Sequence, residues 1–177
     1  MKRAVFLDRD GVINRKAPEG AYVTRWEEFQ FLPGAAQAIS LLNRAGWSVI
    51  VISNQRCVAK GLLSVAELES IHRKMREALA GEGARLDGIY YCPHEKEPPC
   101  ACRKPLPGML LTAAEEHQID LKSSWMVGDA ESDMEAGKSA GCRTLRIIET
   151  PSSQATGADC FAQTLLDASG KILACGG

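Results

Sequence analysis

Apolar runs alternate with amphipathic segments along most of this chain. The runs at 4–8, 47–52, 86–91, 125–129 and 143–148 are short and nearly continuous in their apolar character. Such runs are typical of strands that are buried on both faces of a sheet. We therefore expect five strands in the first 148 residues.

Helices are expected between these strands, because the intervening segments carry recognisable start and stop residues. Ser64 and Glu67 have the spacing of a capping box, and Gly46 and Gly141 stand where helices commonly stop. The predicted helices span 33–46, 64–80, 107–117 and 131–140. Alternating strands and helices predict a Rossmann-like α/β fold, a parallel sheet with helices on both faces.

The C-terminal part has a weaker pattern. Residues 151–157 are expected to form a loop, and 158–174 a last strand and helix. The chain has 177 residues without an internal repeat or a linker, so we expect one domain over 1–177.

Charge and hydropathy restrict the partners and the location. The chain has 21 basic and 22 acidic residues, a balance that favours neither nucleic acid nor a membrane surface as a partner. The apolar run after Lys2 and Arg3 is interrupted at Asp8, too early for a signal peptide. No transmembrane run is present, so we expect a cytoplasmic protein, and no sequence feature demands an oligomer.

The first strand ends in two carboxylates. Asp8 and Asp10 are followed by Gly11, at the carboxyl end of a strand, where open α/β sheets bind ligands. Two anions this close repel each other unless they share a proton or a divalent cation. The pattern favours one carboxylate as nucleophile and the other as acid/base, although Asp and Gly are also common in surface turns.

Three later segments place polar residues in comparable positions. Ser53 follows the second strand, Lys104 precedes a helix, and Asp129 follows the fourth strand with Asp133 four residues on. In this order the four segments resemble the motifs of the haloacid-dehalogenase-like phosphatases. The gaps between the motifs are too short for a large cap domain.

A cluster of metal-binding residues lies ahead of Lys104. Its members are Cys92, His94, Cys100 and Cys102. Three thiols and one imidazole can fill all four positions of a tetrahedral Zn²⁺ site, which makes such a site structural rather than catalytic. Chance clustering and a disulfide are the alternatives, but a disulfide is disfavoured in a cytosolic protein.

The segment from Leu86 to Met109 narrows the resemblance to the heptose 1,7-bisphosphate phosphatases, with the histidinol phosphatases as close relatives. The resemblance covers residues 4–148. It implies an enzyme that removes the 7-phosphate of D-glycero-D-manno-heptose 1,7-bisphosphate, a small-molecule sugar phosphate, in nucleotide-activated heptose synthesis for lipopolysaccharide. Mg²⁺ is the implied catalytic cofactor, and Zn²⁺ is expected to hold the short loop.

Phosphate-ester cleavage then suggests a role for each motif. Asp8 is expected to be the nucleophile and Asp10 the acid/base, with Mg²⁺ held by Asp8, the backbone carbonyl of Asp10, and Asp129. Ser53 and Lys104 are expected to hold the transferring phosphoryl group. The substrate-binding residues are expected to be Asn54, Gln55, Arg56 and Arg103, the two arginines facing a distal phosphate.

Two residues have competing interpretations. Asp133 either orients Lys104 or metal-bound water, or is an ordinary acid at a helix N-terminus. His72 stands beside Arg73 and Lys74, so a solvated helix face is expected rather than a catalytic role.

Two other functions remain open at this point. A histidinol-phosphate phosphatase would share most of the motifs. A zinc-stabilised binding module without turnover is the third possibility, but the intact set of motif residues argues against it.

Overall fold

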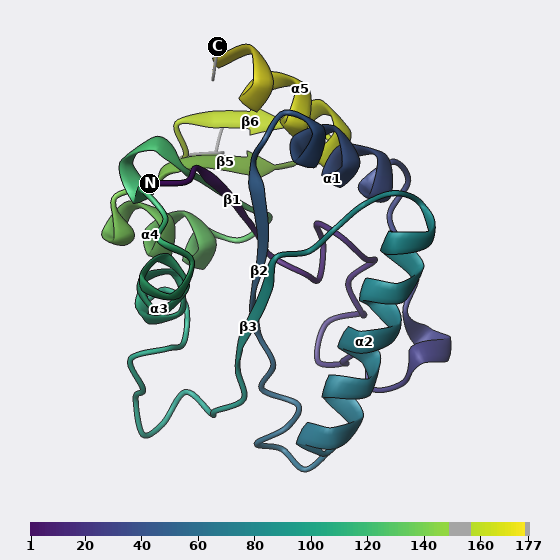
Figure 1. Cartoon of the computed structure of the whole chain (residues 1–177). Coiled ribbons are helices and arrows are strands. Elements are labelled where there is room, and N and C mark those ends of the chain that lie inside the picture. The colour runs from purple at the N-terminus through teal and green to yellow at the C-terminus, as the bar shows by residue number, and fades with distance from the viewer. Residues whose placement is uncertain (149–156, 176–177) are drawn as a thin grey trace.

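A computed structural model of the chain, which describes residues 1–148 and 157–175, has a parallel α/β fold (Figure 1). In these residues six strands form one sheet in the order β3-β2-β1-β4-β5-β6, and every neighbouring pair is parallel. The strands are β1 (Ala4–Leu7), β2 (Ser48–Asn54), β3 (Gly88–Cys92), β4 (Trp125–Gly128), β5 (Arg143–Ile147) and β6 (Cys160–Ala162). All five predicted strands are confirmed, with ends shifted by one or two residues.

The helices also follow the prediction. They are α1 (Ala35–Arg44), α2 (Val65–Gly81), α3 (Gly108–His117), α4 (Glu131–Ala140) and α5 (Leu165–Cys175). The Ser64 hydroxyl accepts a hydrogen bond from the Glu67 amide, and the Glu67 side chain accepts one from the Ser64 amide, which confirms the capping box. The predicted loop at 151–157 lies outside the described residues except for Gly157.

The two faces of the sheet have separate cores, as the alternation of side chains in a strand requires. In β1, Val5 and Leu7 belong to one core, which they share with residues of α1, α2 and α5. Ala4 and Phe6 point to the other face, where they meet residues of α3 and α4. Figure 1 shows the two layers, with α3 and α4 on one side of the sheet and α1, α2 and α5 on the other.

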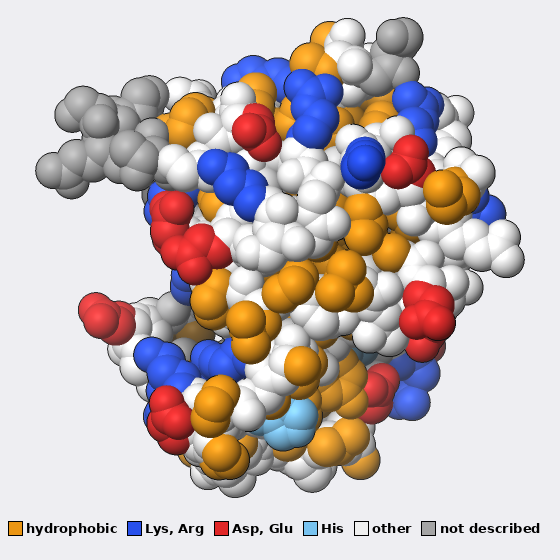
Figure 2. All heavy atoms as spheres, turned by 90° about the vertical axis from the view of Figure 1, so that its left-hand side faces the viewer, with side chains coloured by type: hydrophobic (Ala, Val, Ile, Leu, Met, Phe, Trp, Pro, Cys, Tyr) orange, Lys and Arg blue, Asp and Glu red, His pale blue; other side chains and the backbone are white. Residues whose placement is uncertain are grey.

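The surface agrees with the balanced charge of the chain. On the face that includes α3 and α4, basic and acidic side chains are interspersed with hydrophobic ones (Figure 2). Among the helices that the structure describes, none has the length and apolar character that crossing a membrane requires.

Candidate active site

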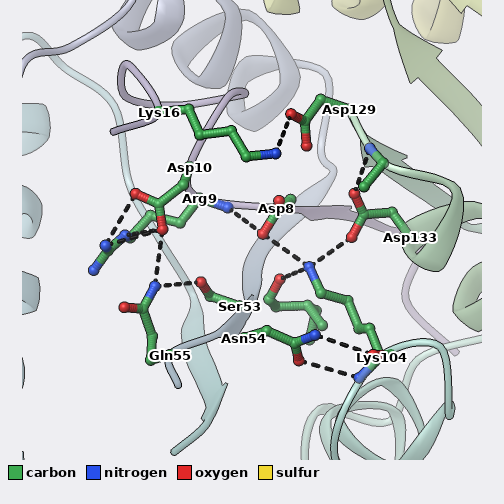
Figure 3. A network of polar contacts seen from close by, with 12 residues as sticks. Asp8, Arg9, Asp10, Lys16, Ser53, Asn54, Gln55, Lys104, Asp129 and Asp133 are labelled. Atoms are coloured by element: carbon green, nitrogen blue, oxygen red, sulfur yellow. Dashed lines mark hydrogen bonds and ion pairs between the residues drawn. The ribbon is translucent and has the colours of Figure 1, made fainter. Parts of the chain in front are cut away.

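The candidate site lies where three neighbouring strands end. Asp8 follows β1, Ser53 is the second-to-last residue of β2, and Asp129 follows β4, so the parallel sheet brings all three to one edge. The Asp8 amide donates to the Val127 carbonyl at 2.9 Å, which continues the ladder between β1 and β4 up to the acid. Figure 3 shows these side chains converging with Lys104, which arrives from the segment before α3.

Lys104 is the centre of this network. Its Nζ lies 2.8 Å from Asp8 Oδ1 and 2.6 Å from Asp133 Oδ1, and it donates to the Ile52 carbonyl at 2.9 Å. Burial alone would lower the pKa of Lys104, but the two carboxylates outweigh it and raise the pKa above its usual value. The side chain is therefore a fixed positive charge beside Asp8.

Both interpretations of Asp133, a partner of Lys104 and an acid at a helix N-terminus, agree with its contacts. It orients Lys104 through the ion pair, and it accepts a hydrogen bond from the Ala130 amide at the start of α4. Its approach to β4 is so close that a Cβ on Gly128 would lie 2.2 Å from the Asp133 Cβ. The glycine before Asp129 is thus a steric requirement.

Asp8 lies among other acids. Burial, with smaller contributions from the charges of Asp133 and Asp129, raises its pKa to about 7 against the opposing effect of Lys104. One carboxylate oxygen each from Asp8, Asp129 and Asp133 lies within 4.8 Å of the others. A divalent cation would relieve this repulsion.

The oxygen atoms fit a hard cation. Asp129 Oδ1 is buried and has no hydrogen-bond partner, while Oδ2 accepts from Lys16 Nζ at 2.9 Å. A Cβ on Gly11 would meet Asp129 Oδ2 at 2.5 Å, so the backbone after Asp10 must be glycine to leave room for this carboxylate. Carboxylate oxygens are the ligands that Mg²⁺ prefers.

Asp10 has a different environment from Asp8. Its two oxygens accept hydrogen bonds from Arg9 at 3.0 and 3.2 Å, from Asn14 at 2.9 Å and from Gln55 at 2.9 Å. Burial raises the pKa of Asp10, but the Arg9 charge and these hydrogen bonds outweigh it and lower the pKa below its usual value. The carboxylate is held with both oxygens engaged.

The polar residues at the end of β2 and directly after it, Ser53 to Gln55, already have partners within the protein. Gln55 Nε2 donates to Ser53 Oγ at 2.7 Å, and Ser53 is buried and does not line the cavity described below. The side-chain amide of Asn54 donates through Nδ2 to the backbone carbonyl of Lys104 at 3.0 Å. Its Oδ1 accepts a hydrogen bond from the backbone N–H of Lys104 at 3.1 Å. Asn54 therefore fixes the backbone that carries Lys104.

A cavity of about 370 Å³ opens above Asp8 and Asp10. The predicted substrate residues Asn54, Gln55 and Arg103 contribute to its wall, but Arg56 does not. The Arg56 guanidinium instead forms an ion pair with Glu95. The remaining wall comes largely from the segment 16–23, which roofs the site as a short loop rather than as a cap domain.

The four predicted zinc ligands come together. The contacts between their ligand atoms are 3.6 Å for Cys92–Cys100, 3.5 Å for Cys100–Cys102, 3.5 Å for Cys92–His94 and 3.3 Å for His94–Cys102. A tetrahedral Zn²⁺ site with ordinary bond lengths has edges of about 3.5–3.8 Å. The donor set and its spacing fit a structural zinc ion.

The expectation for His72 is wrong. The side chain is only 2% exposed, and its Nε2 lies 3.3 Å from Arg9 NH1. The apolar stripe of α2 explains the burial, because Leu68, Ile71, Met75 and Leu79 have the spacing of one helix face and His72 falls within it. The charged neighbours Arg73 and Lys74 obscured this position.

Sequence reasoning also missed Arg9, Asn14 and Lys16. Arg9 and Asn14 hold Asp10, and Lys16 reaches Asp129 from the roof of the cavity. The one available signal was the position of Arg9 between two acids.

Comparisons with known proteins place the chain in a family. The HAD-hydrolase-like family model matches residues 101–157. A D-glycero-β-D-manno-heptose-1,7-bisphosphate 7-phosphatase of Pseudomonas putida is 40% identical over 87% of the chain and 86% of its own length. A protein of the same name from Bordetella bronchiseptica is 44% identical over 87% of the chain and 84% of its own.

Solved structures give the same result. A D,D-heptose 1,7-bisphosphate phosphatase from B. bronchiseptica, crystallised with magnesium and phosphate, superposes with a TM-score of 0.88 at 37% identity. The match covers 98% of this chain and 99% of that one.

Proposed function

Because the chain belongs to the family of the D-glycero-β-D-manno-heptose-1,7-bisphosphate 7-phosphatases, within the HAD-like hydrolases, we propose that it hydrolyses the 7-phosphate of that sugar bisphosphate. The observation that carries the proposal is the Lys104 ammonium between Asp8 and Asp133, at the base of an open cavity. It supplies a positive charge where a phosphate dianion must approach a carboxylate. The β anomer is the proposed substrate because these relatives are named for it.

Asp8 and Asp10 divide the chemistry. An Asp8 carboxylate oxygen attacks phosphorus, and the bond from phosphorus to the sugar oxygen breaks. Asp10, which must first take up a proton against its lowered pKa, donates that proton to the leaving alkoxide. Asp10 then takes a proton from water as the water oxygen attacks phosphorus. The aspartyl-phosphate bond breaks, which releases inorganic phosphate and restores Asp8.

Mg²⁺, when bound, neutralises charge on the phosphoryl oxygens and lowers the repulsion between phosphate and Asp8. Asp8, Asp129 and the backbone carbonyl of Asp10 would hold it. The unpartnered Asp129 oxygen and the elevated pKa of Asp8, about 7, support a cation there. Zn²⁺ is proposed at Cys92, His94, Cys100 and Cys102, where it would fix the loop that ends at Lys104.

The remaining roles concern the substrate. Ser53 and Lys104 are proposed to hold the transferring phosphoryl group, with Asn54 and Gln55 beside it. Arg103 is the better supported candidate for the distal phosphate, since it lines the cavity. Arg56 would have to leave Glu95 to take part.

The wider properties are also proposals. We propose that residues 1–177 act as one domain, as a monomer in the cytoplasm. Gel filtration with light scattering would measure the oligomeric state directly.

The test of function is phosphate release in the presence of Mg²⁺. Both anomers of the heptose bisphosphate should be compared with histidinol phosphate, and Asp8→Asn provides the blank. Preference for the β bisphosphate is expected. Preference for histidinol phosphate would replace the proposed substrate. Turnover of none of the three compounds would leave the proposed function without support.

A further inference from the structure

Arg9 and His72 form a buried pair that the proposed mechanism does not use. Arg9 is 1% exposed and His72 is 2% exposed, although both side chains can carry charge. A buried guanidinium is costly unless its donors are satisfied. The partners of the Arg9 side chain therefore show what its burial serves.

The Arg9 guanidinium has two sets of partners. Its Nε and NH2 donate to Asp10, at 3.2 and 3.0 Å, in a fork that grips both carboxylate oxygens (Figure 3). Its NH1 points the other way and lies 3.3 Å from His72 Nε2. The Phe29 ring lies 5.8 Å from the guanidinium carbon and covers it.

The chemistry of this contact determines the state of His72. A guanidinium has donors and no acceptor, so His72 Nε2 must accept with its lone pair, and the imidazole must be neutral. The ring is packed against Tyr91, with centroids 5.4 Å apart, and α2 fixes its backbone. His72 is thus a rigid acceptor behind Arg9.

We propose that Arg9 and His72 are positioning residues for Asp10: His72 fixes the Arg9 guanidinium, and Arg9 holds the Asp10 carboxylate where it can reach the leaving oxygen. The inference rests on the proposed function, because it concerns the acid step of that reaction. Without the acceptor, the NH1 donor would be buried and unpaired. The fork would then shift toward other acceptors and take Asp10 with it.

Leaving groups of different basicity separate positioning from general structural support. The proton from Asp10 is needed by the alkoxide of a sugar phosphate, but hardly by the phenolate of p-nitrophenyl phosphate. The ratio kcat/KM ends at the first irreversible step, so it excludes hydrolysis of the aspartyl-phosphate. A misplaced acid should therefore lower kcat/KM for the sugar bisphosphate and spare the aryl ester.

The experiment compares both substrates for wild type, His72→Leu, His72→Gln, Arg9→Lys and Asp10→Asn. Asp10→Asn should lose about 10²–10⁴-fold on the sugar substrate, the range for a general acid, and far less on the aryl ester. His72→Leu and Arg9→Lys should show the same selectivity with a loss of about 10-fold or more. His72→Gln keeps an acceptor and should stay within about threefold of wild type.

Tyr91→Phe is the matched control. It removes the hydroxyl that donates to Glu69 at 2.6 Å but keeps the ring that packs against His72, so the substrate ratio should not change. Thermal unfolding of each variant reports folding separately from the ratio.

Three outcomes would overturn the proposal. His72→Leu could lose equally on both substrates, His72→Gln could do no better than His72→Leu, or Arg9→Lys, which leaves the His72 packing intact, could retain the wild-type ratio. If His72→Leu does not fold, the Arg9→Lys and His72→Gln results still decide. If Asp10→Asn itself shows no selectivity, the acid role in the proposed function fails first and takes this inference with it.

Discussion

Two neighbouring regions hold reactive side chains in fixed positions by different physical means. At the ends of β1 and β4, the acids are fixed by the parallel ladder, by the buried Lys104 and by glycines that permit close contact. In the loop from Cys92 to Cys102, the residues between the thiols are largely exposed, and the four ligand atoms lie within 4.8 Å of one another. The first region is ordered by the protein, and the second depends on what its thiols bind.

The two regions are linked by short covalent and polar connections. Lys104 stands two residues beyond Cys102, and Asn54 holds its backbone from the end of β2. Arg56 pairs with Glu95 across the same gap. Substitutions in the two regions should therefore lower activity by different amounts, and the difference can be measured.

The largest effect is expected from Lys104→Ala. The variant removes the charge between Asp8 and Asp133, so phosphate release should fall by about 10³-fold or more, comparable to the loss of a key electrostatic contact. It should also lower stability by roughly 3–5 kcal/mol, because two buried carboxylates lose their partner. Lys16→Ala, which removes an exposed partner of Asp129, should cost far less stability. Equal losses of stability in the two variants would contradict the assignment of Lys104 as the centre of the buried ion-pair network.

Removal of zinc should have an intermediate effect. Cys100→Ser, or a strong chelator, should lower activity by about 10–100-fold by loosening the segment that leads to Lys104, while the β1 end stays folded. Metal content, thermal unfolding and kinetics on the same samples would check this. Cys175→Ser, at an exposed cysteine outside the cluster, is the control. Full activity in a zinc-free protein would show that the position of Lys104 does not depend on the metal in the loop.

Arg56→Ala should have a smaller effect. If Arg56 serves the distal phosphate, KM for the bisphosphate should rise severalfold, whereas Glu95→Gln should leave it similar or lower by freeing the arginine. If the pair only joins the two regions, both variants should change KM alike. An unchanged KM for Arg56→Ala, in a protein that Lys104→Ala inactivates, would remove Arg56 from the substrate site.

The effect that is smallest at neutral pH, and that grows only on acidification, is expected in the dependence of stability on pH. Burial, aided by the Arg9 charge, lowers the pKa of His72 from 6.5 to about 3. Between these two pH values His72 binds a proton in the unfolded chain but not in the folded protein. The folded protein therefore loses no stability through His72 above about pH 6.5, and it loses about 1.4 kcal/mol for each unit by which the pH drops below that value. His72→Gln should lack this loss. The difference in unfolding free energy between the two proteins, measured from pH 7 to 4.5, isolates it from zinc release and from other acids.

The same contrast explains how much the sequence could reveal. Strands, helices and the Ser64 capping box depend on local pattern, and the ends of the five strands and of the four helices before residue 148 were predicted to within two residues. The acids of the site could be placed because parallel strands bring their carboxyl ends to one edge. Short elements such as the 3₁₀ turn Trp26–Glu28 have too little pattern to be predicted.

Contacts between distant segments were beyond the sequence. Asn54 reaches Lys104, and Arg9 reaches His72, through side-chain geometry that no local pattern encodes. For His72 the signal was present, because the apolar stripe of α2 passes through it, but its charged neighbours carried more weight. The roles of the site residues stay predictions until variants are assayed.

The division between roof and base of the cavity has a consequence for evolution. Residues 18–21 of the roof are exposed, and Gly20 has open space around it. The base of the cavity allows no insertion, because the Asn54 side chain is hydrogen-bonded to the backbone of Lys104 and Gly128 is packed directly against Asp133. Length and sequence can therefore drift in the roof while the base stays unchanged, so that a descendant could acquire a new substrate without rebuilding its chemistry.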